Sequence, residues 1–392
     1  MQTFDFDRLH DRRGTNSYKW DQSEALFGDK DILPLWVADM DFQSPPEVVK
    51  ALTERAQHGV YGYTIRPQSY FDSLLEWLKR RHQWEVPQDW LATSPGVVTA
   101  LSLLIHTLTD KGDAIVIQTP VYYPFFDVIQ LNERMLVENP LIIENGLYRM
   151  DFELLERQFA AGAKMLLLCS PHNPGGRVWE QEELIRLGEL CLKYRVWIVS
   201  DEIHFDLVLP GHKHIPIASL SSELAQQTIT CIAPSKTFNM PGISTSTLII
   251  PDERVRRNYV RALKTLSLHL ESYFACTAFE VAYRHGDAWL DSALQYIQDN
   301  IRYLEHFFIE HFPQFKVMSP QATYLVWIDY RDTQLSAAQM KDIMFKQAKV
   351  AFSDGTVFGG EGFLRINVAC PRSILAEALE RFRHAILHND LK

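Results

Sequence analysis

Short hydrophobic runs alternate with amphipathic stretches through the middle of the chain. Four runs are rich in branched side chains, at residues 114–118, 165–170, 196–202 and 228–233. Helical patterns such as residues 181–194 separate them. Apolar runs of this length between helices are typical of buried parallel strands. We therefore predict an α/β fold with a mostly parallel central sheet and helices on both of its faces.

The pattern changes on either side of this central region. The N-terminal part is rich in turn-forming residues but contains the apolar string LPLWVADMDF, so we expect an arm that packs on other parts of the chain. Towards the C-terminus, a long helical pattern at 292–312 precedes strand-like runs at 324–330 and 362–369. The predicted parts are an arm at residues 1–45, a large domain at 46–285 and a smaller α/β domain at 286–392.

Composition narrows the class of protein. The chain has 392 residues, 46% of them hydrophobic, which is enough for a large core and excludes a small binding module. The net charge of −10 argues against a nucleic-acid partner, which needs clustered Lys and Arg. No apolar run approaches the roughly 20 residues that cross a bilayer, and the first residues lack the apolar core of a signal peptide. We expect a cytoplasmic protein without a membrane partner.

Cysteine and histidine usage gives no indication of a metal. The five cysteines are scattered and mostly lie in apolar runs, as expected of reduced thiols in a core. His212 and His214 occur together in GHKHIPI, but no carboxylate or thiol lies beside them. Two histidines at this spacing are more typical of a solvated turn than of a metal site. The sequence predicts no bound metal.

Polar clusters at the ends of the apolar runs are candidates for chemistry. Ser94 and Gly96 precede a strongly apolar helix, whose free N–H groups could bind a phosphate, although ordinary helix capping is the more common reason for such a sequence. Asn173, in SPHNPGG, follows a strand and could donate a hydrogen bond to a ligand oxygen or simply form a turn. Neither signal is specific by itself.

Two further clusters make the combination specific. Asp201 and His204 lie at the end of a buried strand, where a carboxylate is costly unless a cation pairs with it. Ser235 and Lys236 follow the next strand. A cofactor that acts as an electron sink needs a lysine to bind its aldehyde, an acid beside its ring nitrogen, a donor to its phenolate oxygen and a phosphate site. Candidates for all four occur in this chain.

The same residues carry a family resemblance over essentially the whole chain. The motifs are RRGTNSYKWD, LPLWVADMDF, SPGVVTALS, SPHNPGG, SDEIH and PSKTFN. They resemble the fold-type I enzymes that depend on pyridoxal 5′-phosphate, in the class I/II aminotransferase superfamily. Within it they resemble the MalY/PatB group of cystathionine β-lyases, also called cysteine-S-conjugate β-lyases. The resemblance implies a large domain with a mostly parallel sheet, a smaller α/β domain and a homodimer.

The resemblance also implies roles around the cofactor ring. Lys236 would hold pyridoxal 5′-phosphate covalently and, once displaced by substrate, move the α-proton. Asp201 would pair with the ring nitrogen and keep it protonated. Asn173 and His204 fall where the superfamily places contacts to the phenolate oxygen. Tyr122 falls where an aromatic ring stacks on the cofactor, and we count it with Lys236 and Asp201 as catalytic.

Phosphate and substrate contacts follow from the same resemblance. The implied phosphate ligands are the backbone amides of Gly96 and Val97, the side chain of Ser235, and Tyr63 from the second subunit. The chain departs from many aminotransferases because Ser244 and Ser246 stand where an arginine usually binds phosphate. Arg365 matches the arginine that binds the substrate α-carboxylate. We place Trp36 and Asp39 on the substrate side of the site.

The implied reaction is α,β-elimination from L-cystathionine or another cysteine S-conjugate, giving a thiol, pyruvate and ammonia. An aminotransferase is the alternative, since the two reactions share their early steps. The N-terminal string around Trp36 and Asp39 favours the lyase. A regulatory protein that keeps the fold but acts through protein contacts is a third possibility, which no extra domain or basic recognition helix supports.

Overall fold

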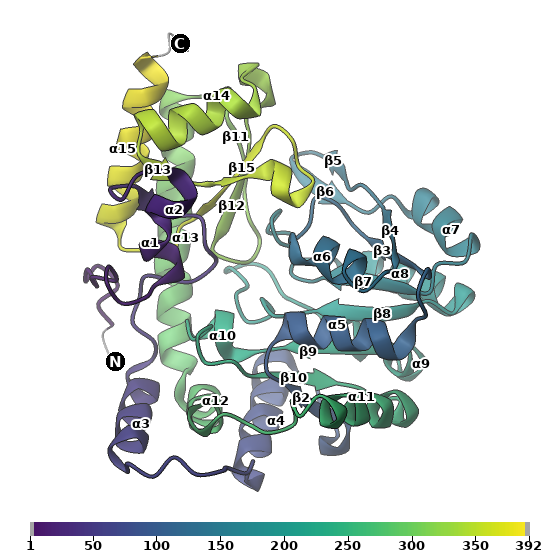
Figure 1. The fold of residues 1–392 in the computed structure, drawn as a ribbon. Coiled ribbons are helices and arrows are strands. Elements are labelled where there is room, and N and C mark those ends of the chain that lie inside the picture. Colours follow the sequence, from purple (N-terminus) through teal and green to yellow (C-terminus); the bar gives the residue numbers. More distant parts are fainter. Residues whose placement is uncertain (1–3, 389–392) are drawn as a thin grey trace.

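A seven-stranded sheet lies at the centre of the computed structural model, which describes residues 4–388 (Figure 1). The strand order is β2-β10-β9-β8-β7-β3-β4. The strands are β2 (Leu91–Ser94), β3 (Ala114–Ile117), β4 (Met135–Glu138), β7 (Met165–Cys169), β8 (Trp197–Asp201), β9 (Thr228–Ile232) and β10 (Ser246–Ile249). Strand β10 runs antiparallel to both of its neighbours, β2 and β9, and the other pairs of adjacent strands are parallel. The predicted α/β fold is confirmed, and the four predicted runs form β3, β7, β8 and β9.

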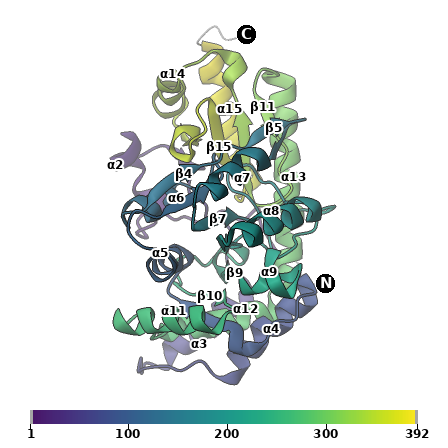
Figure 2. The same cartoon turned by 90° about the vertical axis from the view of Figure 1, so that its right-hand side faces the viewer.

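Helices cover both faces of this sheet (Figure 2). On one face lie α5 (Val97–Leu108), α6 (Pro124–Gln130) and α11 (Glu253–Thr265). On the other lie α7 (Phe152–Ala160), α8 (Gln181–Tyr194) and α9 (Ser222–Gln226). Successive side chains of a strand point to opposite faces, so Ile115 packs on the first layer and Val116 on the second. Two apolar faces explain why these strands appear in the sequence as continuous hydrophobic runs.

A second, antiparallel sheet is built from the C-terminal part of the chain. Its strands, in order, are β11 (Lys316–Met318), β12 (Leu325–Asp329), β15 (Phe363–Asn367) and β14 (Ser353–Asp354). The helices around it are α13 (Asp287–His311), α14 (Ala337–Asp342), a π-helical turn (Ile343–Gln347) and α15 (Arg372–His388). The rings of Trp327 and Phe363 stack at 5.1 Å and join this sheet to the core of the larger one. The domain boundaries at residues 45 and 285 remain predictions.

The N-terminal segment lies against the C-terminal part of the chain (Figure 1). It contains α1 (Tyr18–Asp21), α2 (Ser23–Phe27) and β1 (Leu33–Pro34). Strand β1 pairs in parallel with β13 (Val350–Ala351). Beyond β1, the backbone of residues 37–42 runs between β15 and the loop that follows Lys236, where it is held by hydrogen bonds to Asn367 and Asn239.

The remaining elements lie outside the two large sheets. They are α3 (Pro46–Gln57), α4 (Gln68–His82), α10 (Pro234–Thr237), α12 (Tyr273–His285), the hairpin β5 (Ile142–Glu144) and β6 (Leu147–Arg149), and single turns at Gln88–Trp90, Ile217–Ser219, Arg331–Thr333 and Gly355–Phe358. Helix α4 packs on α12, with the rings of Tyr70 and Phe279 stacked at 4.1 Å. Within residues 4–388, no helix combines the length and apolar character that crossing a membrane requires.

Candidate active site

The carboxyl ends of the parallel strands bring the predicted site residues together. In the register of the sheet, Cys169 at the end of β7 pairs with Asp201 at the end of β8, and Asp201 pairs with Cys231 in β9. The loops that follow these strands carry Asn173 and Lys236, so both emerge at the same edge as Asp201. Ligands of open α/β sheets bind at this edge.

A cavity of about 270 Å³ lies at this edge. Its lining includes Lys236, Asp201, Asn173, His204, Tyr122, Gly96, Val97 and Ser235, which are the cofactor residues predicted from this chain's sequence apart from Tyr63. These residues come from five separate stretches of the sequence, and the fold places them around one space.

Lys236 reaches the cavity from the short helix α10. Its Nζ donates a hydrogen bond to the carbonyl oxygen of Ala38 at 2.6 Å. No carboxylate within residues 4–388 forms an ion pair with it. Desolvation lowers the pKa of Lys236 to about 8, although the charges of Asp39 and Asp201 oppose this effect. An amine with this pKa is partly unprotonated near neutral pH, which suits it to react with an aldehyde and to accept a proton.

Asp201 is a buried carboxylate without a cationic partner. It is 4% exposed, and its Oδ1 accepts one hydrogen bond, from the backbone N–H of Ile203 at 3.1 Å. No ion pair of the described residues includes it. Burial raises the pKa of Asp201 to about 7, with a smaller contribution from the neighbouring Glu202. Such a group gains most from a cationic or proton-donating ligand, and a protonated ring nitrogen is one.

His204 and Tyr122 present neutral polar groups to the cavity. His204 is 3% exposed and its Nδ1 has no hydrogen-bond partner among the described residues. Burial, with the charges of Lys236 and Arg365, lowers the pKa of His204 to about 3, so its ring stays neutral. Burial raises the pKa of Tyr122, so the phenol also stays neutral. A neutral imidazole can donate one hydrogen bond to a ligand oxygen.

The N-terminus of α5 forms another wall of the cavity. Gly96 is its N-cap, and no side chain caps the first turn. Uncapped N–H groups at the end of a 12-residue helix are suited to bind an anion. Ser235 and Ser244 line the same wall, whereas Ser246 lies in β10 and donates to the carbonyl oxygen of Ser94 at 3.1 Å. Binding of a phosphate by neutral donors, in place of the missing arginine, remains a prediction.

Arg365, in β15, is a buried cation at the margin of this space. It is 4% exposed. Its Nη1 donates to Oδ1 of Asn173 at 3.0 Å, and its Nη2 donates to the carbonyl oxygen of Trp36 at 2.8 Å. Its Nε has no partner in the described part of the chain, and no carboxylate there pairs with it. Burial lowers the pKa of Arg365 to about 10. The guanidinium can still accept a carboxylate ligand.

Besides Arg365, three predicted residues do not line the cavity. Trp36 faces Arg365 through its backbone carbonyl, while its indole Nε1 donates to the carbonyl oxygen of Lys19 at 3.3 Å. The carboxylate of Asp39 forms an ion pair with Arg12 at 2.6 Å. Tyr63 is 97% exposed in the segment between α3 and α4. Direct contact of these side chains with a ligand remains a prediction.

Sequence reasoning missed two buried pairs beneath the site. Glu202 pairs with Nε2 of His214 at 2.8 Å, and Asp206 accepts a hydrogen bond from the Thr237 hydroxyl at 2.8 Å. The predicted solvated turn is therefore wrong for His214, which is 4% exposed, because Glu202 needs a buried partner. His212 is exposed. In the described part of the chain, no group of three His, Cys, Asp or Glu side chains could hold a metal.

The donor set of the cavity fits pyridoxal 5′-phosphate. A free lysine amine, a buried carboxylate without a cation, an unpartnered histidine nitrogen and an uncapped helix N-terminus match its aldehyde, ring nitrogen, phenolate oxygen and phosphate. Together with the sheet, this site defines an enzyme of the fold-type I class that uses this cofactor. The chain belongs to the family of class I and II aminotransferases, whose pattern matches residues 30–382.

Relatives of this chain are similar over nearly their full length. Cystathionine β-lyase PatB of Bacillus subtilis is 44% identical, over 97% of this chain and 99% of that protein. Protein MalY of Escherichia coli is 34% identical, over 98% of this chain and 99% of that protein. The crystal structure of cystalysin from Treponema denticola, which contains pyridoxal 5′-phosphate, is 38% identical and superimposes with a TM-score of 0.96 over 100% of both chains.

Proposed function

We propose that this protein is a pyridoxal-phosphate-dependent carbon–sulfur β-lyase that cleaves L-cystathionine or other S-substituted L-cysteines. The observation that carries the proposal is the cavity in which Lys236, Asp201 and the α5 N-terminus surround one space, with Arg365 at its margin. Relatives named cystathionine β-lyase support the same reaction. One water hydrolyses the enamine that elimination leaves, so the products are a thiol, pyruvate and ammonia.

The chain's own residues bind the amino acid and move its proton. Arg365 binds the α-carboxylate through its guanidinium and fixes the α-carbon beside Lys236. The bound cofactor supplies an electron sink for the negative charge that develops at that carbon. The unprotonated amine of Lys236 accepts the α-proton. Asp201 keeps a positive charge on the ring nitrogen, and the β-thiolate then leaves the substrate.

One assay tests this function. Purified protein loaded with pyridoxal 5′-phosphate is mixed with L-cystathionine, and pyruvate, free thiol and the cofactor absorbance are followed together. We expect pyruvate and thiol to appear in equal amounts, because elimination forms one of each. Fully loaded protein that releases neither product contradicts the proposal. Conversion of the cofactor to its amine form by alanine or glutamate would favour the aminotransferase alternative.

Replacing Arg365 by lysine should weaken substrate binding more than turnover. Lysine keeps the charge but loses the fork that binds a carboxylate with two parallel hydrogen bonds. We expect KM for cystathionine to rise by about 10²-fold with a smaller change in kcat. Steady-state kinetics measure both. Arg331→Lys is the matched control, because Arg331 is exposed and pairs with Asp329. An unchanged KM in Arg365→Lys would remove the residue from this role.

We further propose a homodimer in which Tyr63 binds phosphate in the partner's site. The supporting feature is the segment around Tyr63, whose exposed apolar side chains are Val60, Tyr61, Tyr63 and Ile65. Apolar groups gathered at a surface are typical of an interface. The five cysteines of the protein are buried and form no disulfide. This supports the further proposal that the enzyme works in the reducing cytoplasm.

Mixed dimers test the shared site. Tyr63→Ala and Lys236→Ala are each expected to be nearly inactive alone. After random exchange of subunits, about a quarter of the sites combine an intact lysine with an intact tyrosine of the other chain. We therefore expect mixing to restore about a quarter of wild-type activity, measured as pyruvate release. No recovery despite exchange, verified by native mass spectrometry, would place Tyr63 outside the partner's site.

A further inference from the structure

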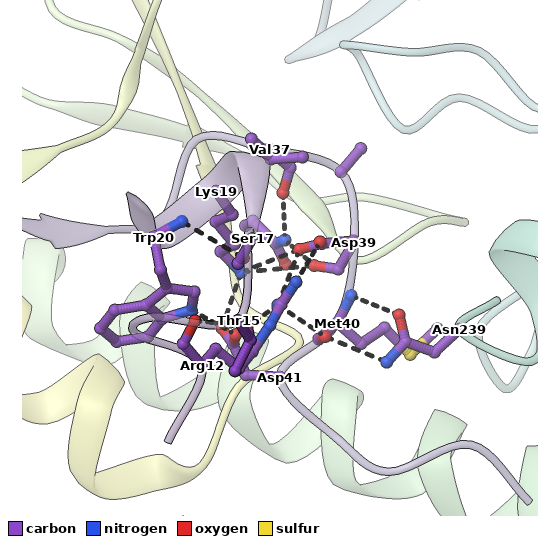
Figure 3. Close-up of polar contacts among 12 residues, drawn as sticks. Arg12, Thr15, Ser17, Lys19, Trp20, Val37, Asp39, Met40, Asp41 and Asn239 are labelled. Carbon is purple, nitrogen blue, oxygen red and sulfur yellow. Dashed lines mark hydrogen bonds and ion pairs between the residues drawn. The ribbon is translucent and has the colours of Figure 1, made fainter. Parts of the chain in front are cut away.

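A cluster of four charged residues, two of them buried, holds the N-terminal arm (Figure 3). The arm contacts Lys236 through the backbone of Ala38. Arg12 forms ion pairs with Asp39 at 2.6 Å and with Asp41 at 2.7 Å. Lys19 forms ion pairs with Asp41 at 2.6 Å and with Asp39 at 3.5 Å. The side chains of Lys19 and Asp41 are 1% and 3% exposed. Each carboxylate therefore faces two cations in a largely dry environment.

The charges of this cluster balance. Burial alone would lower the pKa of Lys19, but Asp41 and Asp39 raise it overall. Burial alone would raise the pKa of Asp41, but Lys19, Trp20 and Arg12 lower it overall. The cluster joins two basic and two acidic side chains, so its formal charges sum to zero. Removing one member leaves an uncompensated charge close to the arm's backbone.

The backbone that carries Asp39 is fixed from two further directions. Asn239, in the loop after Lys236, accepts from the N–H of Met40 at 2.9 Å and donates to the carbonyl oxygen of Phe42 at 2.6 Å. Asn367, at the end of β15, donates to the carbonyl oxygen of Asp39 at 2.6 Å. Figure 3 shows Asn239 on the side of the arm opposite the charged cluster. The backbone of the arm is therefore held between the loop after Lys236 and the end of β15.

Ala38 is the point at which this clamped segment meets the active site. Its carbonyl oxygen accepts from Nζ of Lys236 at 2.6 Å and from the hydroxyl of Tyr324 at 2.9 Å. The next residue, Asp39, places a negative charge near the same amine. The other charged or titratable groups that act on Lys236 are Asp201 from β8, Arg365 from β15, and His204.

We propose that Arg12, Lys19, Asp39 and Asp41 are positioning residues that fix the carbonyl of Ala38 and the carboxylate of Asp39 against the amine of Lys236. The cluster thereby sets both the orientation of the Lys236 amine and the electrostatic potential at its nitrogen. None of the four side chains lines the cavity. The inference rests on the catalytic role proposed for Lys236. Its test measures the pKa of the Lys236 amine, which does not depend on the type of reaction.

The experiment uses single variants of opposite charge. Asp39→Asn leaves the cluster with an extra positive charge, and Lys19→Met leaves it with an extra negative charge. In the cofactor-free full-length chain, cyanate modifies unprotonated amines, so the pH at which Lys236 reacts at half its maximal rate reports its pKa. Peptide mass spectrometry follows Lys236, with the exposed Lys50 as internal reference. We expect the midpoint to fall in Asp39→Asn and to rise in Lys19→Met, each by about half a unit or more.

The double variant distinguishes an effect of the cluster's charge on Lys236 from a loss of contact between the arm and the site. Lys19→Met/Asp39→Asn keeps the neutral Arg12–Asp41 pair, so its midpoint should return to near the wild-type value. If the cluster only holds the arm in place, both single variants expose Lys236 to water and raise its midpoint together. Midpoints that move the same way, or not at all, overturn the proposal. Should Lys19→Met fail to fold, Arg12→Gln replaces it with the same expected sign, since the Arg12 side chain is 24% exposed.

Two further measurements complete the test. The exposed pair Asp342 and Lys346, at 2.8 Å, provides control variants Asp342→Asn and Lys346→Met, which should leave the Lys236 midpoint unchanged. In the loaded enzyme, Asp39→Asn should lower kcat for cystathionine with little change in KM. A higher KM with unchanged kcat would instead support direct substrate contact by Asp39 and overturn the positioning role. If the Lys236 midpoints of the two single variants shift in opposite directions, but neither the wild type nor any variant releases pyruvate, the positioning role stands and only the lyase function is refuted.

Discussion

Replacing Lys236 by alanine is expected to lower kcat/KM for cystathionine by about 10⁴-fold or more. The variant loses both the amine that binds the cofactor and the base that accepts the α-proton. The structure supports this because Lys236 is the only lysine or arginine among the residues that line the cavity in the described part of the chain. Pyruvate release measures turnover, and borohydride treatment followed by mass spectrometry should no longer fix a pyridoxyl group at position 236.

A surface lysine provides the control for this prediction. Lys50 is 78% exposed and lies 3.9 Å from Glu54, so Lys50→Ala should retain wild-type activity and cofactor attachment. Turnover of Lys236→Ala within tenfold of wild type would mean that another group removes the α-proton. A pyridoxyl group fixed on a different lysine of the wild-type protein would show that the catalytic lysine has been wrongly assigned.

Replacing Asp201 by asparagine or alanine is expected to cost about 10³-fold in kcat, with the cofactor still attached to Lys236. At an effective dielectric constant of about 20, two opposite charges about 4 Å apart attract by about 4 kcal/mol, which corresponds to roughly three orders of magnitude in rate. Without the carboxylate, the ring nitrogen loses its proton and the ring becomes a poorer electron sink. Single-turnover kinetics with cystathionine measure the loss directly.

The neighbouring carboxylate is a matched control for Asp201. Glu202 is also buried, but it accepts from the Ser200 hydroxyl at 2.8 Å, pairs with His214, and does not line the cavity. Glu202→Gln should therefore lower stability while changing kcat by less than about tenfold. Equal losses of kcat in the two variants would show that burial of a charge, and not its position beside the ring, is what matters.

The raised pKa of Asp201 also predicts how the cofactor-free protein responds to pH. Its pKa is about 7 in the fold, against an ordinary value of 3.8. A raised pKa contributes stability that is fully present below the ordinary value and is lost as pH rises through 7. The wild type should therefore lose up to about 4 kcal/mol relative to Asp201→Asn between pH 4 and 8, measured by urea unfolding. If the unfolding free energies of the wild type and Asp201→Asn change with pH in parallel, the pKa of Asp201 is not raised.

The amino-acid sequence by itself determined the fold class and most of the cavity lining. Branched apolar runs predicted β3, β7, β8 and β9, because strands covered on both faces need continuous hydrophobic residues. Asp201 is the last residue of β8, Asn173 and Lys236 each lie four residues beyond the end of a strand, and parallel strands end at the same edge. Local patterns therefore placed these residues together. The strands β2, β4 and β10 escaped prediction because none is a continuous apolar run: β2 and β10 contain Ser and Thr, and β4 ends in Glu138.

Only the tertiary structure decided what the N-terminal arm does. The sequence marked Trp36 and Asp39 for substrate contact, yet the indole of Trp36 packs between the rings of Tyr18 and Phe27 and the carboxylate of Asp39 pairs with Arg12. The amine of Lys236 donates a hydrogen bond to the backbone carbonyl of Ala38, 198 residues earlier in the chain. Every residue has such a carbonyl, so no residue type signals it. A contact of this kind is fixed by the packing of distant segments. The periodicity of side chains along one segment carries no information about that packing.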